Sequence, residues 1–207
     1  MSVDRDAVAV WISTLADTLV TDALDAEAIR NRLAAAPDLE AEAFAAEMLS
    51  LMRVIAESVS TPSGFDTIKA GIFEDRATAD FGAILLAVGL SIAGGRASWI
   101  SRPQARAARS RISTAGDSAL AIVSAMGGAA VDLYLWLSRL VEIAVRLVSQ
   151  DAADAVPVVR VETGISMPST VLAYQLYGDA ARAERLVEIA GAATPMLMPV
   201  AFDALES

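Results

Sequence analysis

The sequence of 207 residues contains no cysteine and no histidine. Without cysteine, the chain has neither a disulfide framework nor thiol chemistry. Without histidine, it lacks the commonest general base, the commonest transition-metal ligand and the Ser-His pair of the usual hydrolase triad. We therefore expect no enzymatic activity and no cofactor. A soluble enzyme that works with two carboxylates is the least favoured alternative.

Aromatic and basic residues are also scarce. Aromatic residues make up 5% of the sequence although 55% is hydrophobic, so most of the apolar mass is Ala, Leu, Val and Ile. Abundant Ala and Leu favour helices over strands. The 26 acidic residues outnumber the 16 basic ones and give a net charge of −10. Because nucleic-acid-binding surfaces are basic, this balance argues against a specific nucleic-acid partner.

Residues 81–95 form a 15-residue run without charge. A helix needs about 20 apolar residues to cross a bilayer, and extension to that length would include Arg96. We therefore expect a helix buried in a bundle or in a subunit interface, and no stable membrane span. Whether this run contacts another subunit or a membrane stays open at this point. The polar start of the chain, Met1 to Asp6, is unlike a secretory signal peptide.

Apolar residues recur at helical spacing over residues 1–154, which predicts a helical bundle. The predicted helices begin at Asp4 or Asp6 and end near Leu19, then cover 26–35, 37 to about 60, the run 81–95, 102–126 and 129–149. Residues 61–64 (Thr-Pro-Ser-Gly) predict a loop, and 65–77 are only weakly helical. Polarity rises and periodicity stops at 150–154, which we take as the domain boundary.

The residues after this boundary predict a small unit with the order strand, helix, helix, strand. Val158–Val161 and Phe202–Leu205 are short enough to be strands. Pro168 suits the first turn of a helix, whose apolar positions are Val171, Leu172, Leu176 and Tyr177. Gly178 is expected to end this helix in a left-handed conformation, and Asp179 to cap the next one. That second helix has the apolar side Leu186, Val187 and Ile189.

This segment resembles a LysM-type module and, more closely, the C-terminus of the "DNA circularisation" proteins of Mu-like phages, which are tail baseplate hub components. The matching positions are Leu172, Ala173, Tyr174, Leu176, Tyr177, Gly178, Asp179, Arg182, Pro195, Pro199 and Leu205. The chain departs from the family pattern at Ala190, Thr194 and Val200-Ala201, where the family has Asn, His and a Gly pair. The match covers about a fifth of the chain, and the larger N-terminal region of family members has no counterpart in it.

The periodicity predicts a mainly α fold with a helical body over 1–154, and the resemblance implies an α+β LysM-like module over 155–207. It also implies a structural role in a phage or phage-derived tail baseplate hub, within the virion after synthesis in the host cytoplasm. The expected partners are other baseplate and tail proteins of the hub, tube, wedge or tape-measure type, and we expect multiple copies of this chain. The alternative is a LysM-type protein that binds peptidoglycan during cell-wall passage. The module's turns are rich in Ala and Gly and poor in donors, which favours protein docking over sugar binding.

Two groups of residues are candidate docking sites. Within a cluster that spans Arg96 to Arg111, three arginines share one helical face: Arg102, Arg106 and Arg109. They predict contact with an acidic subunit or a phosphate, or else a solvated helix face. The second group is the predicted turn of the module, with Tyr177, Gly178, Asp179 and Arg182. Glu40, Glu42 and Glu47 lack the loop pattern of a calcium site, so we expect no metal.

Overall fold

The computed structural model describes residues 3–206, and these residues are mainly helical with one two-stranded antiparallel sheet. They form two compact units. The first, which we call the helical unit, contains residues up to Trp99 together with Arg106–Gln150. The second, the C-terminal unit, contains Ile100–Ala105 and the residues from Asp151 onward. The predicted boundary at 150–154 is helical, because the last long helix continues to Asp154.

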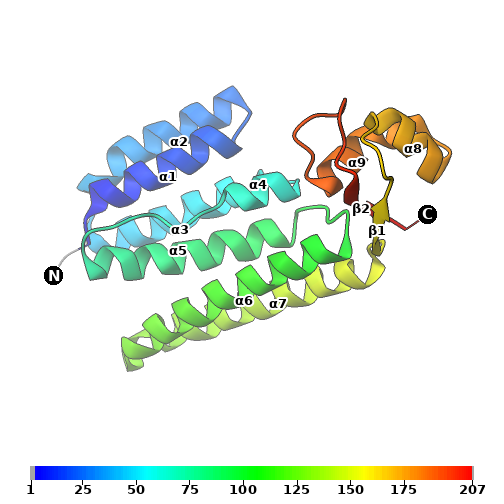
Figure 1. The fold of residues 1–207 in the computed structure, drawn as a ribbon. Coiled ribbons are helices and arrows are strands. Elements are labelled where there is room, and N and C mark those ends of the chain that lie inside the picture. Colours follow the sequence, from blue (N-terminus) through cyan, green and yellow to red (C-terminus); the bar gives the residue numbers. More distant parts are fainter. Residues whose placement is uncertain (1–2, 207) are drawn as a thin grey trace. The chain divides into compact units, whose positions relative to one another are not determined.

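Figure 1 shows the helices α1 to α7 with the labels used below. Their bounds, including two short 3-10 turns marked η, are α1 Arg5–Leu19, α2 Ala23–Ala35, η1 Ala36–Asp38, α3 Ala41–Glu57, α4 Pro62–Thr67, α5 Arg76–Gly94, α6 Arg102–Ala125, η2 Gly128–Ala130 and α7 Val131–Asp154. The helices α6 and α7 each have residues in both units.

Side-chain caps determine where several of these helices begin. Asp4, one of the two predicted starts, caps α1, since its side chain accepts a hydrogen bond from the N–H of Ala7. Asp22 caps α2, so this helix begins three residues earlier than predicted. The predicted loop at 61–64 is wrong, because Thr61 caps the short helix α4 and Pro62 occupies its first turn. A Ser/Thr-Pro pair therefore indicated a helix start rather than a loop.

The third and fifth helices also begin away from their predicted positions. Residues 36–38 form the 3-10 turn η1, and α3 begins only at Ala41. Helix α5 begins at Arg76, capped by Asp75, and therefore includes five residues before the uncharged run. The apolar run alone does not indicate this charged first turn.

The uncharged run 81–95 lies mostly in the core of the helical unit. Leu85, Ala87 and Val88 on α5 are fully or almost fully buried. Helix α5 contacts α3 most extensively, and at Gly94 it approaches the side chain of Ile112 on α6 closely. Among the described residues, α5 is long and apolar enough to cross a membrane by length and composition, but 61% of that window is buried inside the protein. These properties describe the core helix of the unit.

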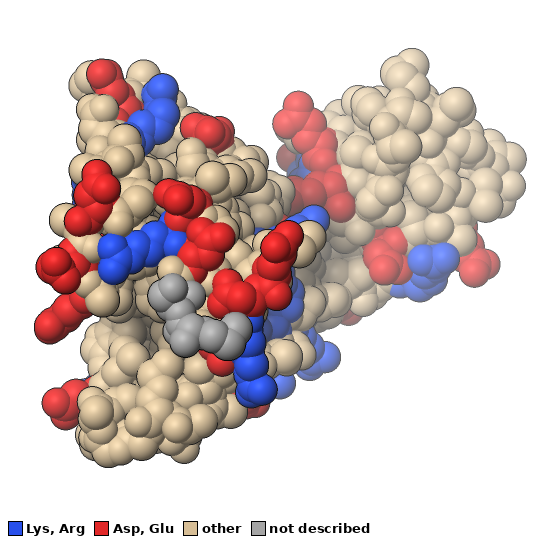
Figure 2. All heavy atoms as spheres, turned by 90° about the vertical axis from the view of Figure 1, so that its left-hand side faces the viewer, with Lys and Arg blue, Asp and Glu red and all other residues tan. Residues whose placement is uncertain are grey.

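Charge is distributed unevenly along the chain. Residues 1–95 contain fifteen acidic and six basic residues, whereas 96–150 contain three acidic residues and seven arginines. Acidic side chains predominate on the upper part of the helical unit's face in Figure 2. The lower part of that face, at the tip of the α6–α7 hairpin, is mostly uncharged, and Asp132 is the only charged residue within 118–138.

The C-terminal unit has the predicted order of strand, helix, helix, strand. Its elements are β1 Val158–Glu162, α8 Ser169–Tyr177, the 3-10 turn η3 Ala180–Arg182, α9 Ala183–Ala190 and β2 Ala201–Leu205. The two strands are antiparallel, with Val158 opposite Leu205 and Glu162 opposite Ala201. This pairing confirms the predicted strands.

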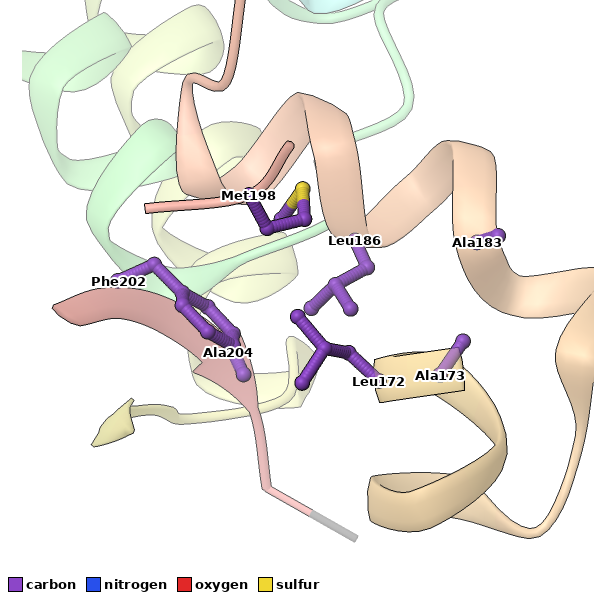
Figure 3. Close-up of a cluster of buried hydrophobic side chains, with 7 residues drawn as sticks. All are labelled: Leu172, Ala173, Ala183, Leu186, Met198, Phe202 and Ala204. Atoms are coloured by element: carbon purple, nitrogen blue, oxygen red, sulfur yellow. The ribbon is translucent and has the colours of Figure 1, made fainter. Parts of the chain in front are cut away.

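Seven buried side chains form the core of this unit (Figure 3): Leu172, Ala173, Ala183, Leu186, Met198, Phe202 and Ala204. They come from both helices, from β2 and from the loop before it, so α8 and α9 pack against the sheet through this cluster. Two predictions about α8 were wrong in detail. Pro168 is the cap residue before the helix rather than its first residue, and Val171 is 43% exposed.

Candidate docking site

The turn after α8 depends on a glycine. Gly178 has φ of 70° and ψ of 7°, which is the left-handed conformation predicted for it. Its N–H donates to the carbonyl of Tyr174 over 2.8 Å and so ends the helix. A Cβ atom at this position would meet no atom within 4 Å. Glycine is therefore needed for its backbone conformation and not for space.

The residues around this glycine form a connected cluster. The Asp179 carboxylate accepts the N–H of Ala181 over 2.9 Å, as predicted. Arg182 Nε lies 4.0 Å from an Asp179 carboxylate oxygen, and its guanidinium carbon lies 5.3 Å from the centre of the Tyr177 ring. The Tyr177 hydroxyl accepts the N–H of Leu205 over 3.0 Å and thus connects α8 to the end of β2. Tyr177, Gly178, Asp179 and Arg182 are therefore brought together, and Tyr177 has a structural role.

The arginines predicted to share a face of α6 have different surroundings. The Arg102 guanidinium donates to the carbonyls of Ala155 and Ala153 over 3.3 and 3.4 Å. These carbonyls lie at the end of α7, where the helix dipole favours a cation. Arg106 and Arg109 are exposed on the following turns of α6. The Arg102 guanidinium is therefore engaged in hydrogen bonds within the chain. Arg106 and Arg109 remain the accessible cations of the predicted face.

The other two arginines of the cluster also bind within the helical unit. Arg111 forms an ion pair with Asp66 at 2.6 Å, and its guanidinium lies over the Phe65 ring at 4.7 Å. Arg96 donates to the carbonyl of Glu57 over 2.8 Å. Such contacts hold loops and helix ends in place, and spacing along the sequence could not reveal them.

Two loops of the C-terminal unit lie side by side. One joins β1 to α8 and the other joins α9 to β2. The N–H of Thr163 donates to the carbonyl of Val200 over 2.9 Å, and the N–H of Met198 donates to the carbonyl of Met167 over 3.1 Å. The Ser166 hydroxyl also donates to the carbonyl of Met198 over 2.6 Å. These bonds hold the two loops together as one surface.

This surface carries exposed apolar side chains, which we call the loop patch. Its four residues are each about half exposed or more: Ile165 64%, Met196 67%, Leu197 66% and Val200 49%. Met198, in the same loop as Met196 and Leu197, is buried in the core instead. The loop patch was not predicted from the sequence. Three of its residues lie in a short apolar stretch with two prolines and no helical spacing, and this pattern was the available signal.

Some acidic residues of the helical unit cap helices or form ion pairs. Arg32 holds the Glu47 carboxylate with two bonds of 2.6 and 3.1 Å. The hydrogen bonds from Arg32 outweigh partial burial and lower the pKa of Glu47. Hydrogen bonds from the side chain and backbone of Thr78 lower the pKa of Asp75. Within residues 3–206, no three acidic side chains are placed to hold a metal ion.

No protein-family model matches this chain, and no curated protein matches it significantly. The resemblance to the phage tail proteins therefore depends on the residues of the C-terminal unit alone.

Proposed function

We propose that the protein is a structural component of a phage or phage-derived contractile tail, located in the baseplate hub and acting by protein docking. The observation that carries this proposal is the strand–helix–helix–strand unit with the Tyr177–Gly178–Asp179 turn, because the resembling tail proteins share this sequence pattern. The cap geometry at Gly178 and Asp179 supports the proposal, since it gives a physical reason for both residues of that pattern.

The chemistry of the C-terminal unit favours docking to protein over binding to sugar. Sugar recognition needs polar groups that are available to the ligand. In the paired loops, the Thr163 hydroxyl donates to Ile165 and the Ser166 hydroxyl donates to Met198. The exposed part of these loops is the apolar loop patch, and such patches mark protein contacts. The peptidoglycan-binding alternative therefore has the weaker support.

The expected partners are neighbouring hub, tube, wedge or tape-measure proteins. Arg106 and Arg109 are available for an acidic neighbour, and the loop patch is available for an apolar one. We propose no catalytic step and no cofactor for this role. A hub component is part of the assembled tail, so the expected location is the virion. The chemistry of the two surfaces differs, so they suit two different contacts.

The decisive experiment uses particle assembly. In a host that produces the tail, Leu197→Asp adds a charge to the loop patch without removing a core contact, and we expect the loss of assembled tails. Val171→Asp is the matched control, because Val171 is an exposed apolar residue outside the two loops. Normal particles from Leu197→Asp, or equal defects in both variants, would contradict docking through the loop patch.

The turn provides a second test of the same proposal. Gly178→Val and Arg182→Glu should each abolish tail assembly and leave the helical unit folded by circular dichroism. Sedimentation of the wild-type protein with purified peptidoglycan tests the alternative. Normal infectious particles from both variants, together with strong sedimentation, would replace the baseplate proposal with the peptidoglycan one.

A further inference from the structure

The strand β1 of the C-terminal unit has one free edge. Within residues 3–206, it pairs with β2 and with no other strand. In an antiparallel pair, the main-chain groups of successive residues point alternately toward the partner strand and away from it. The N–H of Thr163, next to β1, donates to the carbonyl of Val200, and this bond fixes the alternation along β1. The residues whose main-chain groups point away from β2 are therefore Val158, Arg160 and Glu162.

The outer edges of the two strands differ. At β2, the N–H of Leu205 points away from β1 and donates to the Tyr177 hydroxyl. Along the edge of β1, the chain has a main-chain neighbour just before the strand, where the N–H of Arg102 donates to the carbonyl of Val156. Among the described residues, none bonds to the outward main-chain groups of β1 itself. An open strand edge is a template for a further strand.

The charged residues of the sheet all lie on one of its faces. They are Arg160 and Glu162 on β1 and Asp203 on β2. Arg160 lies opposite Asp203 and forms an ion pair with it at 3.2 Å. Between the two charged residues of β1, Val161 points to the other face and packs against the core of the unit. The free edge thus carries a positive, an apolar and a negative residue in succession.

This succession is complementary to itself. When β1 of a second copy lies antiparallel along the free edge with Val161 opposite Val161, each Arg160 lies opposite Glu162 of the other copy. Opposite charges at facing positions stabilise a strand pair, whereas like charges destabilise it. The adjacent registers place either Arg160 opposite Arg160 or Glu162 opposite Glu162. The edge of β2 offers no such match, because Asp203 is the only charged residue of that strand.

We propose that two copies of the chain form a two-fold symmetric dimer through the free edge of β1, with Val161 opposite Val161. The same surface of both copies meets, so the contact closes and grows no further. Each Arg160–Glu162 pair exchanges two main-chain hydrogen bonds, and the two sheets join into one. Each Arg160 then lies between Asp203 of its own chain and Glu162 of the other. The contact does not depend on the proposed tail function.

Charge reversal in the full-length protein tests the contact. Wild type should show a monomer–dimer equilibrium in analytical ultracentrifugation, and added salt should weaken the dimer. Glu162→Arg and Arg160→Glu should each weaken the homodimer about tenfold or more, because two attractive pairs become repulsive. Mixed in equal amounts, these two variants should form a heterodimer, since every facing pair again has opposite charges. Glu188→Arg is the control, because Glu188 is exposed on α9 and the charge changes equally. Circular dichroism checks that all variants remain folded.

Cysteine cross-linking measures the register directly, because the natural chain has no cysteine. Facing residues at a non-hydrogen-bonded position have Cα atoms about 4.5 Å apart, which a disulfide can span. Val161→Cys should therefore form a disulfide-linked dimer on oxidation. Val159→Cys should form little dimer alone, although Val159 is the more exposed of the two, and should cross-link to Thr163→Cys when the two are mixed.

Two results would overturn the proposal. Equal cross-linking of Val161→Cys and Val159→Cys, each oxidised alone, would show random collision instead of a fixed register. A monomeric wild type would leave the edge of β1 free for a strand of another protein.

Discussion

In the helical unit, several glycines lie where two helices touch, and Gly127 is its one described glycine with positive φ. In the C-terminal unit, every described glycine has positive φ. A Cβ atom on Gly116 would lie 2.7 and 2.9 Å from the two methyl groups of Val141 on the facing helix. Gly178 and Gly191 have φ of 70° and 61°, and a Cβ atom on either would meet nothing within 4 Å. One unit therefore depends on the distance between helices and the other on the direction of its turns.

This difference follows from the size of the two cores. The helical unit buries many side chains along a row of helices, so small residues at the crossing points bring large surfaces together. The C-terminal unit has a core of seven buried residues. A core of that size cannot hold two helices and two strands without turns that fix their directions. Substitutions should therefore act through packing in one unit and through backbone conformation in the other.

The largest expected effect is the loss of an aromatic side chain from the small core. Phe202 is 1% exposed, and Phe202→Ala should cost about 3–5 kcal/mol of unfolding free energy. Hydrogen exchange read by mass spectrometry should show lost protection in β1, α8, α9 and β2, with α1, α3 and α5 still protected. Val200→Ala is the control, because Val200 is 49% exposed. Equal loss of protection in both units would contradict their separate cores.

A substitution at the helix crossing comes next. Gly116→Ala forces α6 and α7 apart or displaces Val141, which should lower the unfolding free energy by about 1–3 kcal/mol. Urea denaturation followed by circular dichroism measures this change. In Gly128→Ala, the new Cβ atom has open space around it, so the effect should stay within about 0.5 kcal/mol. Similar costs for both variants would show that crowding is not the cause.

The turn glycine should show a different pattern. Gly178→Ala puts a side chain on a left-handed residue and should cost about 1–2 kcal/mol. Asn enters this conformation more readily, so Gly178→Asn should recover part of that loss. Gly116→Asn should recover nothing, because the crossing lacks space. Thermal denaturation of the four variants compares the two sites, and recovery by Asn at both would remove the distinction.

The smallest expected effect concerns the ion pair between α2 and α3. Glu47 has a lowered pKa because Arg32 donates hydrogen bonds to its charged form. The pair therefore stabilises the fold at neutral pH, and this stability is lost as the pH falls below the ordinary value of about 4.3 towards the lowered one. Glu47→Gln should cost about 1 kcal/mol or less, since the pair is partly exposed.

Denaturation at two pH values measures this effect, with Glu42→Gln as a control on the same helix. The difference between Glu47→Gln and wild type should be present at neutral pH and shrink in acid. A difference that stays constant with pH would show that the ion pair is not its source.

Local signals in the sequence predicted much of the C-terminal unit. Gly178 and Asp179 behave as predicted, because a left-handed cap and an N-cap depend on adjacent residues. The short helix after Thr61 was missed, because Pro and Gly are typical of loops as well as of helix starts. The bonds of Arg102 and Arg111 join residues more than 40 positions apart, and no local pattern contains them. The loop patch was not predicted either, because its residues come from two loops that are distant in the sequence.

The pairing of β1 with β2 has a consequence for folding. Val158 pairs with Leu205, and the segment of chain that connects the two paired strands contains both helices of the unit. Contacts between distant residues form slowly, because the chain must first lose the entropy of closing the loop. Neighbouring helices such as α1 and α2 need no such closure. We therefore expect the sheet to be the last part to form, with two unpaired strands exposed to other chains until α8 and α9 have collapsed onto each other.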